Sequence, residues 1–123
     1  MALLYEDLTN RIIGAAFRVH NILGRGFLER AYRDALCIEL ADNGIAYEQE
    51  KVVNITYRGH VLPHAFVADI VVEGKVILEL KAAKMIDPVH IAQLTNYLKA
   101  SGIRVGFVIN FGTDKMTFER IIC

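Results

Sequence analysis

The segment FVADIVVEGKVILELKAA, residues 66–83, constrains the fold most, because it is a hydrophobic segment with strand-like alternation that carries charged residues in its middle. Alternate side chains of a strand point to opposite faces of a sheet, so the pattern predicts two strands around a Glu-Gly-Lys turn. One face is expected to be wholly apolar and to hold Phe66, Ala68, Ile70, Val72, Val76, Leu78, Leu80 and Ala82. The opposite face is apolar except at Asp69, Glu79 and Lys81, where unpartnered burial of charge would be costly.

The length of the turn decides which residues of the two strands are neighbours. If residues 73–75 form a three-residue turn, Asp69 lies opposite Glu79, with Cβ atoms about 5 Å apart. A two-residue turn would place Asp69 opposite Leu78 instead, because a slip of one residue exchanges the faces. The alternation favours the first register, so we expect two carboxylates side by side.

Helical and strand periodicity along the rest of the chain predicts an α/β fold. The predicted elements are helices at 6–23 and 27–43, strands at 53–57, 61–72 and 76–82, a helix at 88–100, and strands at 105–109 and 116–121. The order α-α-β-β-β-α-β-β predicts a mixed central sheet flanked by helices on both faces. A chain of 123 residues has the size of one domain, which we take to span 1–123.

Composition narrows the functional classes. Fourteen basic and fourteen acidic residues give a net charge of zero, which argues against strong nonspecific polyanion binding but leaves room for a local basic patch. Cys37 and Cys123 form no metal or disulfide pattern, which predicts a reducing cytoplasm. No apolar run reaches the roughly 18 residues of a membrane span, and the N-terminus lacks the order of a secretory signal. We therefore expect a cytoplasmic protein with no membrane partner.

Asp69, Glu79 and Lys81 together predict a divalent-cation site. Two adjoining carboxylates on a mostly buried face repel each other, and a cation with a preference for oxygen ligands, such as Mg²⁺, removes the conflict. Lys81 shares the face of Glu79 and can hold or deprotonate a water beside the metal, or stabilise charge on a phosphate. The alternatives are a Glu–Lys pair on a solvated face, which the flanking aliphatic residues disfavour, and an internal ion-pair cluster with a purely structural role.

These residues resemble a known nuclease core. Asp69 followed by the E-L-K run at residues 79–81 resembles the D…ExK core of the PD-(D/E)XK nuclease superfamily. The following helix carries Gln93 and Tyr97, which is similar to the QxxxY motif of the RecB-like branch.

Upstream, residues 26–32 spell GxxExxY, and the motifs together resemble the GxxExxY protein family. The likeness covers nearly the whole chain, including His20 before the glycines and the N-F-G run at 110–112. The chain departs from the pattern at residues 67–68, which are Val-Ala where a basic residue before the aspartate is expected.

The resemblance implies a restriction-endonuclease-like core and a Mg²⁺-dependent nuclease acting on DNA, with Mn²⁺ able to substitute. By analogy, Asp69, Glu79 and the carbonyl of Leu80 bind the metal, and Lys81 positions or activates the water. Glu29 corresponds to an acidic residue that many members place close to the metal. The other implied site residues are Gln93, which supports the site or the substrate strand, and Tyr97, Tyr32 and His20 in substrate-binding or supporting roles.

Two alternatives stay open on sequence grounds. Glu29 and Arg33 are four apart on one side of a helix, so Glu29 can instead form a surface ion pair. The chain as a whole can be a nuclease-fold nucleic-acid-binding or regulatory module without turnover. Because so small a core leaves little surface for a duplex, a homodimer or a protein partner would then complete it.

Overall fold

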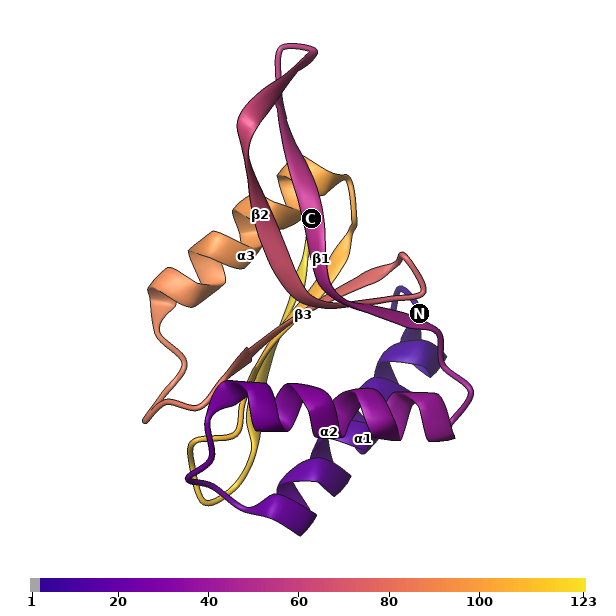
Figure 1. Cartoon of the computed structure of the whole chain (residues 1–123), viewed down its shortest axis with the longest axis vertical. Coiled ribbons are helices and arrows are strands. Elements are labelled where there is room, and N and C mark those ends of the chain that lie inside the picture. Colours follow the sequence, from indigo (N-terminus) through magenta and orange to yellow (C-terminus); the bar gives the residue numbers. More distant parts are fainter. Residues whose placement is uncertain (1–2) are drawn as a thin grey trace.

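A computed structural model describes residues 3–123 as a five-stranded mixed sheet with helices on both faces (Figure 1). The elements are α1 (Glu6–Leu23), α2 (Glu29–Asp42), β1 (Tyr47–Tyr57), β2 (His60–Val72), β3 (Val76–Lys81), α3 (Pro88–Ser101), β4 (Val105–Asn110) and β5 (Thr117–Ile122). The strands lie in the order β1-β2-β3-β4-β5, antiparallel except for the parallel pair β3–β4. The predicted order of elements is confirmed, although β1 begins at Tyr47 rather than residue 53 and α2 at Glu29 rather than residue 27.

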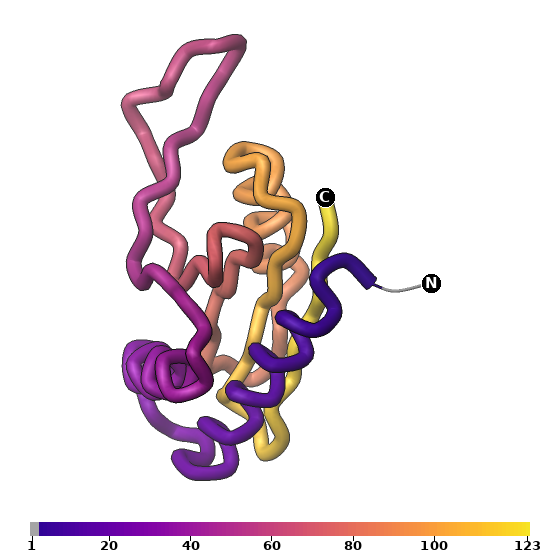
Figure 2. The backbone as a smooth tube through the Cα atoms, turned by 90° about the vertical axis from the view of Figure 1, so that its right-hand side faces the viewer, coloured from indigo at the N-terminus to yellow at the C-terminus, as the bar shows by residue number. Residues whose placement is uncertain are grey.

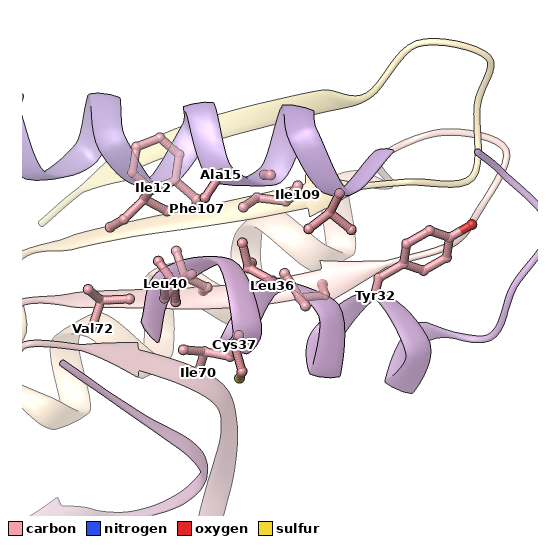
Figure 3. Close-up of a cluster of buried hydrophobic side chains, with 14 of the residues drawn as sticks. Ile12, Ala15, Tyr32, Leu36, Cys37, Leu40, Ile70, Val72, Phe107 and Ile109 are labelled. Carbon is pink, nitrogen blue, oxygen red and sulfur yellow. The ribbon is translucent and has the colours of Figure 1, made fainter. Parts of the chain in front are cut away.

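Each face of the sheet is covered by its own hydrophobic cluster. The larger cluster joins α1 and α2 to the sheet, where Ile12 and Leu36 belong to the same buried group as Ile109 (Figure 3). The smaller cluster packs Leu94 and Leu98 of α3 against the opposite face. Each fully buried large aliphatic side chain contributes about 1.5–3 kcal/mol, so both layers hold the sheet firmly.

The β2–β3 hairpin has the predicted register. Residues 73–75 form a three-residue turn, and the pairing runs from Val72↔Val76 to Ile70↔Leu78. The paired ladder stops there, one step before Asp69 and Glu79. At that step the Asp69 side chain replaces the main-chain pairing, because its Oδ2 accepts a hydrogen bond from the Leu80 amide at 2.8 Å.

The prediction of one wholly apolar face is wrong in the upstream half of β2. Phe66 and Ala68 pack in the cluster beneath α3, whereas Ile70 packs in the cluster beneath α1 and α2. The β1–β2 register is unchanged across this point, but Glu50, which that register places opposite Asp69, has a left-handed φ of +50°. Such a conformation is uncommon for a residue other than glycine, and it coincides with the level at which the two faces exchange, at Asp69.

The tip of the β1–β2 hairpin projects beyond the rest of the molecule (Figures 1 and 2). The tip is a two-residue turn in which Arg58 and Gly59 have φ values of +49° and +82°, the conformation that tight hairpins favour. None of the helices within residues 3–123 is long and apolar enough to cross a membrane.

Candidate functional site

Asp69, Glu79 and Lys81 meet where β2 and β3 part. All three side chains are half-buried, and the intervening Leu80 is buried in the core. The Oε1 atom of Glu79 is buried without a hydrogen-bond partner in the part of the chain that the structure describes. A buried carboxyl oxygen without a partner carries a desolvation penalty, which a proton or a cation can relieve.

The environment of Glu79 favours its protonated form. Burial raises the pKa of Glu79 to about 8, and the negative charge of Asp69 and a hydrogen bond with Asp69 add to the rise. The ammonium of Lys81 acts in the opposite direction but does not cancel it. At neutral pH the pair of acids therefore holds a proton that a divalent cation would displace.

The donor set fits a cation such as Mg²⁺ with a small number of protein ligands. No group of three or more His, Cys, Asp or Glu side chains converges as a metal site anywhere in residues 3–123. Mg²⁺ is commonly held by one or two carboxylates, with water and substrate phosphate completing its octahedron. Asp69, Glu79 and the main-chain carbonyl of Leu80 meet that requirement without a third acid.

A cavity of about 210 Å³ opens onto this point, and its lining joins residues from α2, β2 and β3. Glu29, Arg30, Arg33, Asp69 and Leu80 line it. The expected proximity of Glu29 to the acidic pair is thus present in the geometry. The alternative pairing of Glu29 with Arg33 is not formed, because Arg33 Nη1 donates to Glu50 Oε1 at 2.7 Å.

The GxxExxY segment positions Glu29 through a buried tyrosine. The hydroxyl of Tyr32 donates to the Gly24 carbonyl at 2.6 Å and accepts from the Phe27 amide at 3.2 Å. Gly26 has a φ of +109°, which a side chain would strain. The loop is therefore tied to the helix that follows it, and Glu29 stands in the first turn of α2, where the helix dipole favours a carboxylate.

The N-F-G run at residues 110–112 connects the two halves of the site. Asn110 is fully buried, and its side chain accepts from the Ala83 amide at 2.9 Å and donates to the Ala83 carbonyl at 3.0 Å. The Phe111 amide donates to the Lys81 carbonyl at 2.8 Å, and the Phe111 ring stacks on Tyr32 at 4.6 Å. One short segment thus fixes both the end of the strand that carries Lys81 and the tyrosine that positions Glu29.

We expect Gly112→Ala to lower the free energy of unfolding by about 3 kcal/mol or more, at the upper end of the cost of overpacking. A Cβ at this position would lie 2.3 Å from the Ala83 carbonyl oxygen and 2.4 Å from the Ala83 nitrogen, and this backbone is held by Asn110. Urea unfolding followed by circular dichroism measures the change.

Gly14→Ala is the matched control, because a Cβ there meets only Arg18 Nη1 at 3.7 Å within α1. It should stabilise the protein by about 0.5–1 kcal/mol, the helix preference of alanine over glycine. Equal unfolding midpoints for Gly112→Ala and the parent protein would contradict the close packing of this segment.

Of the nine expected site residues, three line the cavity, namely Glu29, Asp69 and Leu80, and six do not, namely Glu79, Lys81, Tyr32, Gln93, Tyr97 and His20. Gln93 is exposed on α3, and its Nε2 donates to the Tyr97 hydroxyl at 2.6 Å, while the Tyr97 ring stacks on Phe66 at 3.8 Å. His20 is buried, with Nε2 lying 2.9 Å from the Thr113 carbonyl oxygen, so its contacts support the loop after Phe111. The structure brings Glu29, Asp69 and Leu80 together at one cavity, and Glu79 and Lys81 flank Leu80 on β3. Gln93, Tyr97 and His20 do not line this cavity.

Sequence reasoning missed two further contributors. Arg30 lines the cavity next to Glu29, and the only sequence signal is its place in the same helical turn. Asn110 was noticed only within the family resemblance. Its physical signal is a polar amide at the end of the otherwise apolar run VGFVI, followed closely by a glycine.

The five-stranded mixed sheet, with two helices on one face and one on the other, is a nuclease fold with a restriction-endonuclease-like core. The chain belongs to the PD-(D/E)XK nuclease superfamily, whose family model matches residues 6–121. No curated protein matches the sequence.

Solved structures of similar fold include nucleases. SSO0001 is 21% identical with a TM-score of 0.58, and the match covers 96% of this chain. This chain spans only 59% of the length of SSO0001, which is less than two thirds. LHK-Exo, an alkaline exonuclease from Laribacter hongkongensis, is 12% identical with a TM-score of 0.51, over 97% of this chain and 82% of that one. The structure of LHK-Exo in complex with dAMP is 11% identical with a TM-score of 0.52, and the match covers 93% of this chain and 82% of that chain. At these identities the likeness is one of fold.

Proposed function

We propose that this chain is a metal-dependent nuclease that hydrolyses phosphodiester bonds of DNA. The observation that carries the proposal is the buried Glu79 oxygen beside Asp69, which has no hydrogen-bond partner within residues 3–123, because a bound cation would relieve both its desolvation and the repulsion between the two acids. Membership of the nuclease superfamily supports it, and so does the nucleotide ligand of the similar exonuclease. We further propose that residues 1–123 form a single domain of the GxxExxY type. We also propose that it acts in the cytoplasm, since Cys37 and Cys123 are both free thiols.

In this proposal the residues in and beside the cavity have separate roles. A Mg²⁺ or Mn²⁺ ion held by Asp69, Glu79 and the Leu80 carbonyl would supply Lewis-acid stabilisation of the charge that develops on the phosphate. The ammonium of Lys81 orients the attacking water by donating a hydrogen bond to it and stabilises the negative charge that develops on the phosphate. Glu29 reaches the same cavity from α2 and holds water there by hydrogen bonding.

Supporting roles fall to residues outside the cavity. Gln93 and Tyr97 present a hydrogen-bonded pair on α3, which we assign to contact with the substrate strand. Tyr32 and His20 hold the loops on which the cavity depends. A homodimer or a protein partner would extend the small surface that one chain offers to a duplex.

A second candidate function is a nucleic-acid-binding or regulatory module without turnover. The observation that favours it is the position of Gln93, which is hydrogen-bonded to Tyr97 of its own helix and does not line the cavity that contains Asp69. A residue placed there can contact nucleic acid without taking part in cleavage. In that case the acidic pair would bind a cation for structural reasons.

Calorimetric titration with Mg²⁺ and Mn²⁺, beside nicking assays on a supercoiled plasmid and on single-stranded circular DNA, tests the proposal. We expect cation binding that Glu79→Gln abolishes, and nicking only when cation is present. Glu73→Gln is the matched control, because Glu73 is exposed in the β2–β3 turn and does not line the cavity. Cation binding without nicking of either DNA would favour the module, and the absence of cation binding by the parent protein would overturn the site itself.

A further inference from the structure

A second hollow adjoins the cavity that contains Asp69. It has a volume of about 360 Å³, and its walls are Phe27, Leu28, Glu29, Arg30 and Ala82. Glu29 and Arg30 line both hollows, so the two spaces share one wall. The volume lies near the lower end of the roughly 300–1,000 Å³ typical of small-molecule sites. A space of this size accommodates a small molecule or one unit of a polymer, not the broad surface that a folded protein partner needs.

The lining of this hollow combines apolar surface with a free cationic group. The side chains of Phe27 and Leu28 are 50% and 71% exposed, although both are large and apolar. Phe27 is nevertheless fixed in place, because its amide is bound by the Tyr32 hydroxyl and its ring meets the Tyr32 ring edge-on at 6.2 Å. An aromatic ring that is held rigidly and left exposed is suited to stacking with a planar ligand.

Arg30 supplies the charge. Throughout residues 3–123 the ion pairs involve Arg18, Arg25, Arg33 and Lys51, and none involves Arg30. Its place in the shared wall puts a guanidinium between the acidic pair and the apolar hollow. Guanidinium groups bind phosphate through two parallel hydrogen bonds, so Arg30 is suited to a phosphate that spans the two spaces.

We propose that this hollow is a nucleotide subsite, in which Phe27 stacks on the base next to the cleaved bond and Arg30 binds the adjoining phosphate. The inference rests on the proposed nuclease function and adds a substrate class to it. A base can stack on Phe27 only after it leaves its own helix, and stacking on an aromatic ring is tolerant of sequence. The substrate is therefore DNA that is single-stranded or frayed at this nucleotide, taken without sequence preference.

A tryptophan probe tests the subsite directly. The chain contains no tryptophan, so Phe27→Trp introduces a single fluorophore that keeps the aromatic surface. Titration with a six-nucleotide oligothymidylate, with Ca²⁺ present to prevent turnover, should quench this fluorescence. Phe17→Trp is the matched control, because Phe17 is 42% exposed on α1 and lines neither hollow, and it should show no quenching.

Affinity measurements complete the test. By fluorescence anisotropy with the same labelled oligonucleotide, Phe27→Ala and Arg30→Ala should each weaken binding about tenfold, within the range found for one stacked base. Arg104→Ala, which removes an exposed arginine away from both hollows, should bind as the parent does. A blunt, fully paired duplex should compete at least tenfold more weakly than the single strand.

The subsite and the nuclease proposal fail in different ways. If the protein cleaves DNA but Phe27→Ala and Arg30→Ala keep the affinity of the parent, the subsite is wrong and the nuclease assignment stands. If Phe27→Trp is quenched but no cation produces cleavage, the subsite stands and the nuclease assignment is wrong. Unaltered tryptophan fluorescence at saturating oligonucleotide overturns the subsite whatever the activity.

Discussion

Lys81→Ala is expected to lower the rate of cation-dependent DNA cleavage by about 10²- to 10³-fold, the range found for loss of one group that stabilises the charge of the transition state. Lys81 is the cation of the E-L-K run, two residues from Glu79 on β3, and it is half-buried where β2 and β3 part. Its loss removes the group that orients the water without touching the two acids. Single-turnover cleavage at saturating Mn²⁺ measures the effect on the chemical step.

The same assay on Asp69→Asn should show a comparable loss for a different reason. The asparagine side-chain oxygen can still accept from the Leu80 amide, so the strand end keeps its shape, but the charge that holds a cation is gone. Lys75→Ala is the control, because Lys75 is exposed in the turn of the same hairpin. Cleavage by Lys81→Ala or Asp69→Asn at the rate of the parent, with unchanged circular dichroism, would show that these residues do not perform the chemistry.

The second large effect is on stability as a function of pH. Burial beside Asp69 raises the pKa of Glu79 from 4.5 to about 8, so the folded protein binds a proton that the unfolded chain releases between these values. The stability that Glu79 contributes is fully present below pH 4.5 and is lost as the pH rises towards 8. The expected slope within that window approaches about 1.4 kcal/mol per pH unit, the equivalent of one pKa unit.

Glu79→Gln isolates this contribution, because glutamine has nearly the same shape and no titratable proton. The difference in free energy of unfolding between the parent and Glu79→Gln, from urea titrations at pH 5, 6, 7 and 8, should move steadily in favour of the variant. Mn²⁺ should restore the stability of the parent at pH 8, since a ligand of the folded state alone stabilises it. A difference that stays constant with pH would mean that Glu79 is ionised and well solvated.

The parts of the fold that follow from local patterns could be predicted from the sequence. Alternation and the Glu-Gly-Lys turn gave the β2–β3 register, and this register alone brings Asp69 to the level of Glu79. The capping of α3 by Asp87 and its termination at Gly102 are local in the same sense. A period and a turn length are properties of neighbouring residues, which is why they can be obtained without knowing the tertiary structure.

What could not be predicted depends on contacts between distant segments. The exchange of faces at Asp69 coincides with Glu50 in a left-handed conformation, and Glu50 accepts a hydrogen bond from Arg33 of α2. The two hydrogen bonds between Asn110 and Ala83 join residues that are 27 positions apart in the sequence. The place of Arg30 in the cavity wall likewise depends on how α2 packs against the sheet, because helical spacing shows only which residues share a side.

The most direct test of the account is a crystal structure of the protein soaked in Mn²⁺, with anomalous scattering used to locate the ion. The account predicts one ion in contact with a carboxylate oxygen of Asp69 and one of Glu79, at about 2.0–2.1 Å if its geometry follows that of Mg²⁺. It also predicts Lys81 alongside that ion. An ion bound elsewhere, or two carboxylates turned to opposite sides of the sheet, would contradict the central claim that these acids share a cation.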